Sequence, residues 1–177
     1  MKVFRSLLPL VLLSFPMEGA QAGEIFAGLL AHDVDTALTR GGYERGVDLQ
    51  LGWRGDKIRS LGMIGSPSPY LFGSLSTAGG TSFAAAGVSW RLGGRLYVRP
   101  GIGVAVHNRN GFIVGEDGFR QDFGSRVLFQ PEIGIGLQVS DRLSVEASWV
   151  HLSQGQLFSR QNPGMDSIGV RLNHRFR

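Results

Sequence analysis

Residues 127–139, VLFQPEIGIGLQV, alternate between two kinds of side chain. The odd-numbered positions are apolar: Val127, Phe129, Pro131, Ile133, Ile135, Leu137 and Val139. The even-numbered positions between them are mostly small or polar: Leu128, Gln130, Glu132, Gly134, Gly136 and Gln138. Successive side chains of a β-strand point to opposite faces, so this period of two predicts one long strand with two different faces.

The same alternation recurs at 47–54, 84–92 and 96–106. Long strands with an apolar outer face and a glycine-rich or polar inner face are typical of transmembrane β-barrels, whereas soluble sandwiches more often use shorter strands. We therefore predict an all-β fold, an eight-stranded antiparallel transmembrane β-barrel of the outer membrane. The expected strands are 24–33, 43–54, either 57–65 or 69–77, 81–92, 95–107, 125–139, 142–153 and 166–176.

The connections between these strands alternate in length. Tight turns are expected at 54–57, 92–95 and 140–142, and longer loops at 33–42, 107–124 and 154–165. Outer-membrane barrels have short periplasmic turns and long external loops. The loop 154–165 is therefore expected on the outer side of the membrane.

The N-terminus has the pattern of a secretory signal peptide. Lys2 and Arg5 precede a short apolar run, which is followed by Ala20-Gln21-Ala22. This order of basic, apolar and small residues predicts export and cleavage. We expect residues 1–22 to be the signal peptide and 23–177 to be a barrel domain in the outer membrane of a Gram-negative cell. The chain has no cysteine, so no disulfide is available to stabilise it.

A His, a Ser and an Asp lie within HLSQGQLFSRQNPGMD, residues 151–166. His151 and Ser153 have the parity of the apolar Trp149, and Asp166 has the parity of the apolar Ile168. Consecutive antiparallel strands pair, so the three polar side chains are expected to meet on the outer wall. A Ser hydroxyl becomes a nucleophile when a base lies beside it and a third group orients that base. The simpler interpretation is that the three are polar residues at the membrane boundary with no catalytic role.

The longer stretch HLSQGQLFSRQNPGMDSIGVRLNHRF resembles the C-terminal signature of the lipid A 3-O-deacylase family, outer-membrane esterases of the PagL type. The resemblance begins near Gly124. It implies an eight-stranded barrel that removes the ester-linked 3-position acyl chain of lipid A as a 3-hydroxy fatty acid. It further implies that Ser153 is the nucleophile, His151 the general base and Asp166 the orienting acid, with no cofactor and no metal.

The signature is not followed at every position. Gln154 stands where the family has an Asn that helps to shape the oxyanion hole, and an Asp stands where some members have the longer Glu. The oxyanion donors are expected to be the backbone N–H groups of Gly155 or Gln156, with Gln154 assisting. Asn162 matches an Asn of the family loop, and it either supports the site or forms the turn before Pro163.

The formal net charge of +4 does not by itself identify a binding partner. Basic residues near the outer surface, Arg126 and Arg160 among them, either contact the phosphates of lipopolysaccharide or are ordinary charges of the rim. Nothing in the sequence indicates nucleic-acid binding. The sequence leaves open whether the protein forms a homodimer.

Two other classes of function compete with the esterase. A non-enzymatic small outer-membrane barrel, an adhesin or structural protein, explains the strands and the signal peptide but not three polar residues on one face. A soluble periplasmic barrel that binds a lipid inside would need an apolar interior, and the glycine-rich or polar inner faces argue against it.

Overall fold

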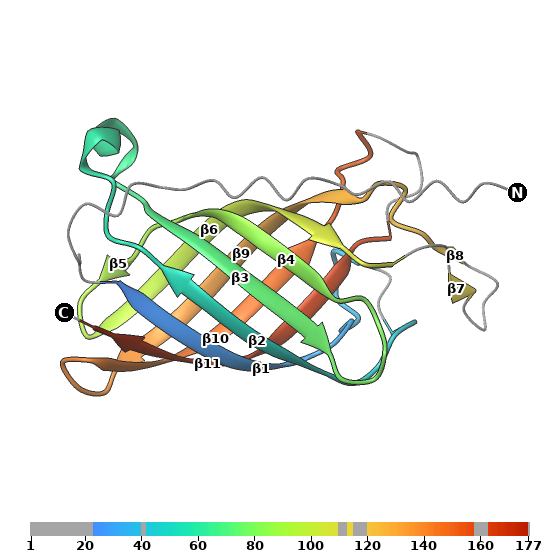
Figure 1. Ribbon diagram of the computed structural model, residues 1–177, viewed down its shortest axis with the longest axis horizontal. Helices are drawn as coiled ribbons and strands as arrows, with labels where there is room; N and C mark the ends of the chain where they lie inside the picture. Colours follow the sequence, from blue (N-terminus) through green and yellow to red (C-terminus); the bar gives the residue numbers. More distant parts are fainter. Residues whose placement is uncertain (1–22, 40–41, 110–112, 115–119, 158–162, 177) are drawn as a thin grey trace, which may run out of the picture.

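The chain folds into a closed antiparallel β-barrel, shown from the side in Figure 1. The computed structural model describes residues 23–39, 42–109, 113–114, 120–157 and 163–176. Pairing of the first barrel strand with the last, and of β4 with β6, closes the ring. This confirms the predicted closed, eight-stranded antiparallel β-barrel. Its strands are β1 (Glu24–Ala31), β2 (Val47–Arg54), β3 (Ser68–Ser76), β4 (Phe83–Ser89), β6 (Leu96–His107), β9 (Val127–Gln138), β10 (Leu143–Leu152) and β11 (Met165–Arg175).

Three short strands lie outside this ring or at its edge. The strand β5 (Leu92–Gly93) pairs with the start of β6. The strands β7 (Ile113–Val114) and β8 (Arg120–Gln121) pair with each other within the connection from β6 to β9. No helix in the described part of the chain is long and apolar enough to cross a membrane.

The third barrel strand is the second of the two predicted alternatives, and 57–65 is not a strand. Residues 59–64 form a short 3-10 helix, η1 (Arg59–Ile64), so the tight turn expected at 54–57 is also wrong. All six helical residues are exposed, so this helix has no core to pack on. Gly65 and Ser66 then adopt φ values of +86° and +50°, which end the helix before β3 begins.

The two ends of the barrel differ. The loop end, at the right of Figure 1, carries the connections 32–46, 77–82, 108–126 and 153–164. The terminal end, at the left, carries the start of β1, the end of β11 and the remaining connections. The pairs of strands joined at the terminal end by 90–95 and 139–142 have the short connections that the sequence predicted.

The wall follows the predicted parity. The apolar side chains of β9 that were expected on one face are exposed on the outside, among them Val127, Phe129, Ile133, Ile135 and Leu137. The alternate positions face the interior, where Gln130 and Glu132 are buried. An outer surface of leucine, isoleucine and valine suits contact with lipid tails.

The interior is layered by residue type. From the terminal end to about midway it holds six buried charged side chains: Glu24, Arg54, Arg99, Glu132, Glu146 and Arg171. They are paired, with 2.9 Å between Arg99 Nε and Glu146 Oε2 and 3.0 Å between Arg171 Nη1 and Glu132 Oε2. Pairing is what makes buried charges tolerable. An apolar layer that includes Phe72, Phe83 and Leu128 continues toward the loop end.

Candidate functional site

His151 and Asp166 form a close pair on the hairpin of β10 and β11. The two residues stand directly opposite each other in the strand register. His151 Nδ1 lies 2.7 Å from Asp166 Oδ1. Opposed residues of an antiparallel pair project to the same face, so register alone brings these side chains together. The shorter Asp therefore reaches the imidazole without the extra methylene of a Glu.

Ser153 lies just beyond the end of β10, and its backbone is still held in register. Its N–H donates to the carbonyl of Phe129 at 3.1 Å, and its carbonyl accepts the Phe129 N–H at 2.7 Å. This pairing continues the register that sets Val150 opposite Glu132. Ser153 therefore keeps the outward parity of His151 and of the exposed Phe129. The three predicted residues share one face at one end of the wall.

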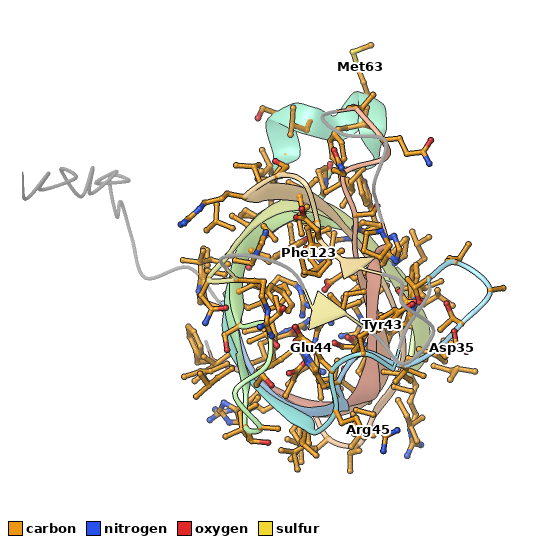
Figure 2. The ribbon with its side chains drawn as sticks, turned by 90° about the vertical axis from the view of Figure 1, so that its right-hand side faces the viewer. Asp35, Tyr43, Glu44, Arg45, Met63 and Phe123 are labelled. Carbon is orange, nitrogen blue, oxygen red and sulfur yellow. The ribbon has the colours of Figure 1, made fainter. Side chains whose placement is uncertain are left out.

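The pair is more buried than its outward parity suggested. His151 is 9% exposed and Asp166 is fully buried. The segment that follows β1 covers them, because the Val34 N–H donates to the Asp166 carbonyl at 2.7 Å and the Thr36 hydroxyl donates to Asp166 Oδ2. In the view from the loop end, Asp35 of this segment lies outside the ring of strands (Figure 2). The acid is therefore shielded rather than open to lipid.

A tight turn follows Ser153. The Leu157 N–H donates to the Gln154 carbonyl at 3.1 Å, and Gly155 and Gln156 between them have φ values of +60° and +58°. Positive φ at both central positions is the mark of a type I′ turn. Gly155 and Gln156 are exposed, whereas Gln154 is fully buried and makes contacts of its own. The predicted donors, the N–H groups of Gly155 and Gln156, thus lie in the turn two and three residues after Ser153.

The remaining predicted residues are farther from the pair or outside the described part of the chain. Arg126 is exposed immediately before β9, three residues before Phe129, and it has interactions of its own. Three residues span about 10 Å of strand, and Phe129 pairs with Ser153. Arg126 therefore lies about 10 Å closer to the rim of the loop end than Ser153. Arg160 and Asn162 lie outside the described residues.

A second group of polar side chains lies at the mouth of the barrel. His32 is buried between two carboxylates, with Nδ1 2.7 Å from Asp48 Oδ1 and Nε2 2.7 Å from Glu44 Oε2. Glu44 also accepts hydrogen bonds from Thr81 and Arg109. Figure 2 shows Glu44 within the ring of strands. We call these five residues the mouth cluster.

The mouth cluster joins three loop-end connections to one another and to β2 through hydrogen bonds and ion pairs. Burial would lower the pKa of His32, but its hydrogen bonds to Asp48 and Glu44 raise that pKa from 6.5 to about 9. Both ring nitrogens donate to carboxylates only when the imidazole is protonated. Burial likewise opposes ionisation of Glu44, yet its bonds to His32 and Thr81 leave its pKa below the usual value. The cluster is therefore a set of paired charges.

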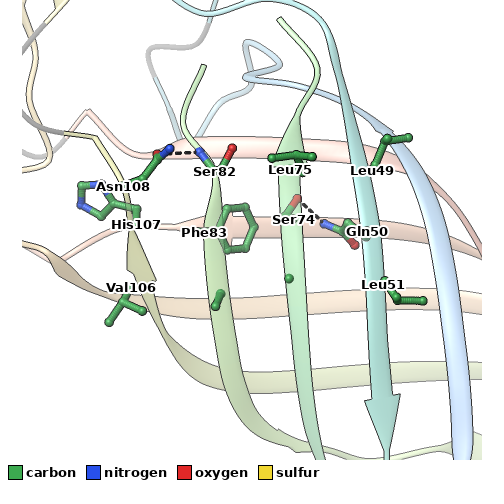
Figure 3. A pocket seen from close by; sticks show the side chains of 12 residues that line it. Leu49, Gln50, Leu51, Ser74, Leu75, Ser82, Phe83, Val106, His107 and Asn108 are labelled. Atoms are coloured by element: carbon green, nitrogen blue, oxygen red, sulfur yellow. Dashed lines mark hydrogen bonds between the residues drawn. The ribbon is translucent and has the colours of Figure 1, made fainter. Parts of the chain in front are cut away.

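A hollow of about 790 Å³ lies on the wall opposite the His–Asp pair (Figure 3). Leu49, Leu51, Leu75 and Val106 line it, and a side chain added at Gly73 would meet open space. Its polar contacts are structural, such as the Ser82 N–H donating to Asn108 Oδ1 at 2.9 Å. It contains no paired base and acid of the kind that activates a nucleophile. Among the described residues, no three His, Cys, Asp or Glu side chains are arranged to hold a metal ion.

Two neighbours of the pair were not predicted from the sequence. The Trp149 ring stacks on the His151 ring, with centroids 5.6 Å apart and planes 23° apart. Parity could have found this contact, because the two residues are two apart on one strand face. Thr36 gave no signal, since it belongs to a loop more than a hundred residues away and loops have no period.

Comparison with known proteins supplies a family. The family model described as lipid A 3-O-deacylase (PagL) matches residues 39–175. No curated protein sequence matches the chain.

Solved structures agree on the fold. The crystal structure of the outer membrane enzyme PagL is 17% identical, with a TM-score of 0.60, covering 85% of this chain and 98% of that one. Neisserial surface protein A is 11% identical, with a TM-score of 0.57 and coverage of 90% and 100%. The N-terminal β-barrel domain of Pseudomonas aeruginosa OprF is 13% identical, with a TM-score of 0.54 and coverage of 88% and 99%. At these identities the three similarities concern architecture alone.

Proposed function

Because the chain belongs to the lipid A 3-O-deacylase family, we propose that it is an outer-membrane serine esterase that hydrolyses the 3-O-linked acyl chain of lipid A. The observation that supports this most is the 2.7 Å contact between His151 Nδ1 and Asp166 Oδ1, on the same face as Ser153. The product is a free 3-hydroxy fatty acid. We further propose that residues 1–22 are a signal peptide that directs export and is then cleaved, and that residues 23–177 form the barrel in the outer membrane.

The chemistry divides into two transfers. His151 donates its Nδ1–H to Asp166, which leaves Nε2 as the base. Nε2 takes the Ser153 hydroxyl proton while the oxygen attacks the ester carbonyl, and the same proton then goes to the departing sugar hydroxyl. Water, deprotonated by Nε2, attacks the acyl-enzyme and frees the fatty acid and Ser153. Asp166 remains ionised and stabilises the imidazolium that forms in each step.

The oxyanion that forms in each transfer needs hydrogen-bond donors. The Ser153 N–H is already donated to Phe129, and the Leu157 N–H closes the turn onto Gln154. We assign the role to the N–H groups of Gly155 and Gln156, which lie between them. A missing donor at such a site costs about 10²–10³ in rate. Gln154 and Asn162 are proposed to support this turn.

The position on the outer wall suits a substrate that stays in the membrane. Phe129 and Leu157 near Ser153 are exposed apolar residues that can contact acyl chains. The ester of a lipid embedded in the outer leaflet would then lie at the level of the loop end. Arg126 and Arg160 are proposed to contact the lipid A phosphates from the rim.

Product analysis tests the proposal. Purified protein is incubated in detergent with lipopolysaccharide, and lipid A and released fatty acids are measured by mass spectrometry. We expect lipid A to lose one 3-hydroxyacyl chain from the 3-position and an equal amount of that free acid to appear. Unchanged lipid A with folded protein would favour the non-enzymatic barrel instead.

A further inference from the structure

We propose that Thr36 is a positioning residue for the His151–Asp166 pair. This inference rests on the proposed esterase function. Thr36 precedes the segment matched by the family model, which begins at residue 39. It belongs to the connection between β1 and β2, whereas the proposed triad belongs to the last hairpin. The site would therefore be completed by a distant loop.

The Thr36 hydroxyl occupies the carboxylate oxygen that His151 leaves free. His151 Nδ1 contacts Oδ1 of Asp166, and the Thr36 hydroxyl donates to Oδ2. The oxygen of Thr36 in turn accepts the Leu38 N–H at 3.0 Å. That bond occupies a lone pair and leaves the hydroxyl proton for the carboxylate. Two consecutive hydrogen bonds therefore connect the Leu38 N–H, the Thr36 hydroxyl and the Asp166 carboxylate.

The loop is attached to the site at more than this one bond. The Val34 N–H donates to the main-chain carbonyl of Asp166, so the residue is held by both its backbone and its side chain. Thr39 lies beside Gly164, where an added Cβ would be 2.9 Å from Thr39 Cγ2 and 3.2 Å from His151 Cε1. Residues 34–39 are thus bonded to Asp166 and lie close to His151 on the far side of Gly164.

The burial of Asp166 explains why a second donor is needed. An ionised carboxylate removed from water is stable only when hydrogen bonds replace its hydration. His151 holds Oδ1 and the Trp149 side chain is a further donor to the carboxylate, but the hydroxyl of Thr36 is the donor to Oδ2. The Thr36 hydroxyl holds Oδ2 in place. Because the carboxylate is rigid and planar, Oδ1 is then held against His151 Nδ1. Loss of such support for a catalytic group typically costs about 10–100-fold in activity.

The test compares three variants with the wild-type protein. Thr36→Val keeps the shape and removes the donor, Thr36→Ser keeps the donor, and Thr77→Val is the matched control. Thr77 is also a loop-end threonine, and its hydroxyl donates to the Val47 carbonyl at 2.8 Å. We expect Thr36→Val to lower kcat about 10–100-fold with little change in KM. Thr36→Ser should restore most of kcat, and Thr77→Val should leave both constants unchanged.

A spectroscopic readout keeps the inference separate from the proposed activity. The chain has four histidines, and the Nδ1–H signal of His151 can be assigned in isotope-labelled protein with His151→Gln. We expect this signal to broaden or shift in Thr36→Val and to remain in Thr36→Ser. If the wild type proves inactive on lipopolysaccharide, the proposed function fails and this signal decides the positioning role. An unchanged signal with unchanged kcat in Thr36→Val would overturn the inference.

Discussion

At the scale of single residues, the proposed site depends on which atoms of Asp166 and His151 meet. The bond from Nδ1 to the carboxylate selects the tautomer in which Nε2 is free to act as the base. The acid has no contact with solvent, so its two oxygens depend on protein donors. We therefore expect the rate of deacylation to depend on the hydrogen bond between His151 Nδ1 and Asp166 Oδ1.

Asp166→Asn should remove the charge of this side chain and change the tautomer of His151 while it keeps the shape of the side chain. The amide fits the same space, but it can donate to Nδ1 and so place the imidazole proton on the wrong nitrogen. We expect kcat/KM for lipid A deacylation to fall by about 10³–10⁴ while the barrel still folds. Steady-state fatty acid release measures this, with folding checked by heat-dependent gel mobility. A loss smaller than about tenfold would remove Asp166 from the mechanism.

His32 makes a separate prediction, for stability against pH. Its pKa is raised from 6.5 to about 9 in the folded state, so folding is favoured by the proton it holds. That contribution is fully present below about pH 6.5 and is lost as pH rises through about 9. His32→Gln should therefore lower Tm more at pH 6 than at pH 10.

Thermal unfolding in detergent, followed by circular dichroism, measures this difference. The exposed His174 provides the matched control, and His174→Gln should not change Tm at either pH. An equal loss of Tm for His32→Gln at pH 6 and pH 10 would show that the proton of His32 does not stabilise the fold.

At the scale of elements, the β10–β11 hairpin shows how far the sequence predicts the site. Period-two parity predicts that His151, Ser153 and Asp166 share one face, because strand geometry fixes side-chain direction. Parity could not reveal that the loop carrying Thr36 buries Asp166, since that contact depends on how distant segments meet. Local pattern also failed at 55–67, where residues without a core to pack on formed a 3-10 helix.

The turn after Ser153 carries the prediction for Gln154. Gln154→Asn restores the residue of the family signature and leaves every backbone N–H of the turn in place. We expect deacylase activity to be kept or raised, with a stability loss of about 1 kcal/mol for the buried methylene that is removed. Kinetics and thermal unfolding of the same preparation check both parts. A large drop in kcat would mean that the longer amide is adapted to this turn.

At the scale of the whole molecule, the barrel reverses the usual distribution of residues. Its apolar surface faces outward and its paired charges face inward, so the wall requires lipid or detergent around it. The layered interior could not be predicted in detail, because the pairing of Arg99 with Glu146 depends on the arrangement of strands around the ring. The predicted alternation fixed only which positions would face inward.

A charge on the outer wall tests the membrane-spanning arrangement. Ile133 lies midway along β9 and is exposed. Ile133→Arg should reduce the free energy of unfolding in lipid vesicles by about 2–4 kcal/mol. Asp141→Arg, in the exposed turn before β10, should change it little. Denaturant titration in vesicles checks this, and equal effects for the two variants would argue against a lipid-facing β9.

The most direct measurement of the central claim is mass spectrometry of lipid A after treatment with Ser153→Ala. Ser148→Ala is the control, because Ser148 lies on the same strand with the opposite, inward parity and is buried. We predict that the wild type and Ser148→Ala remove one 3-hydroxyacyl chain, whereas Ser153→Ala leaves lipid A intact. Removal of that chain by folded Ser153→Ala at the wild-type rate would contradict a mechanism that begins at Ser153.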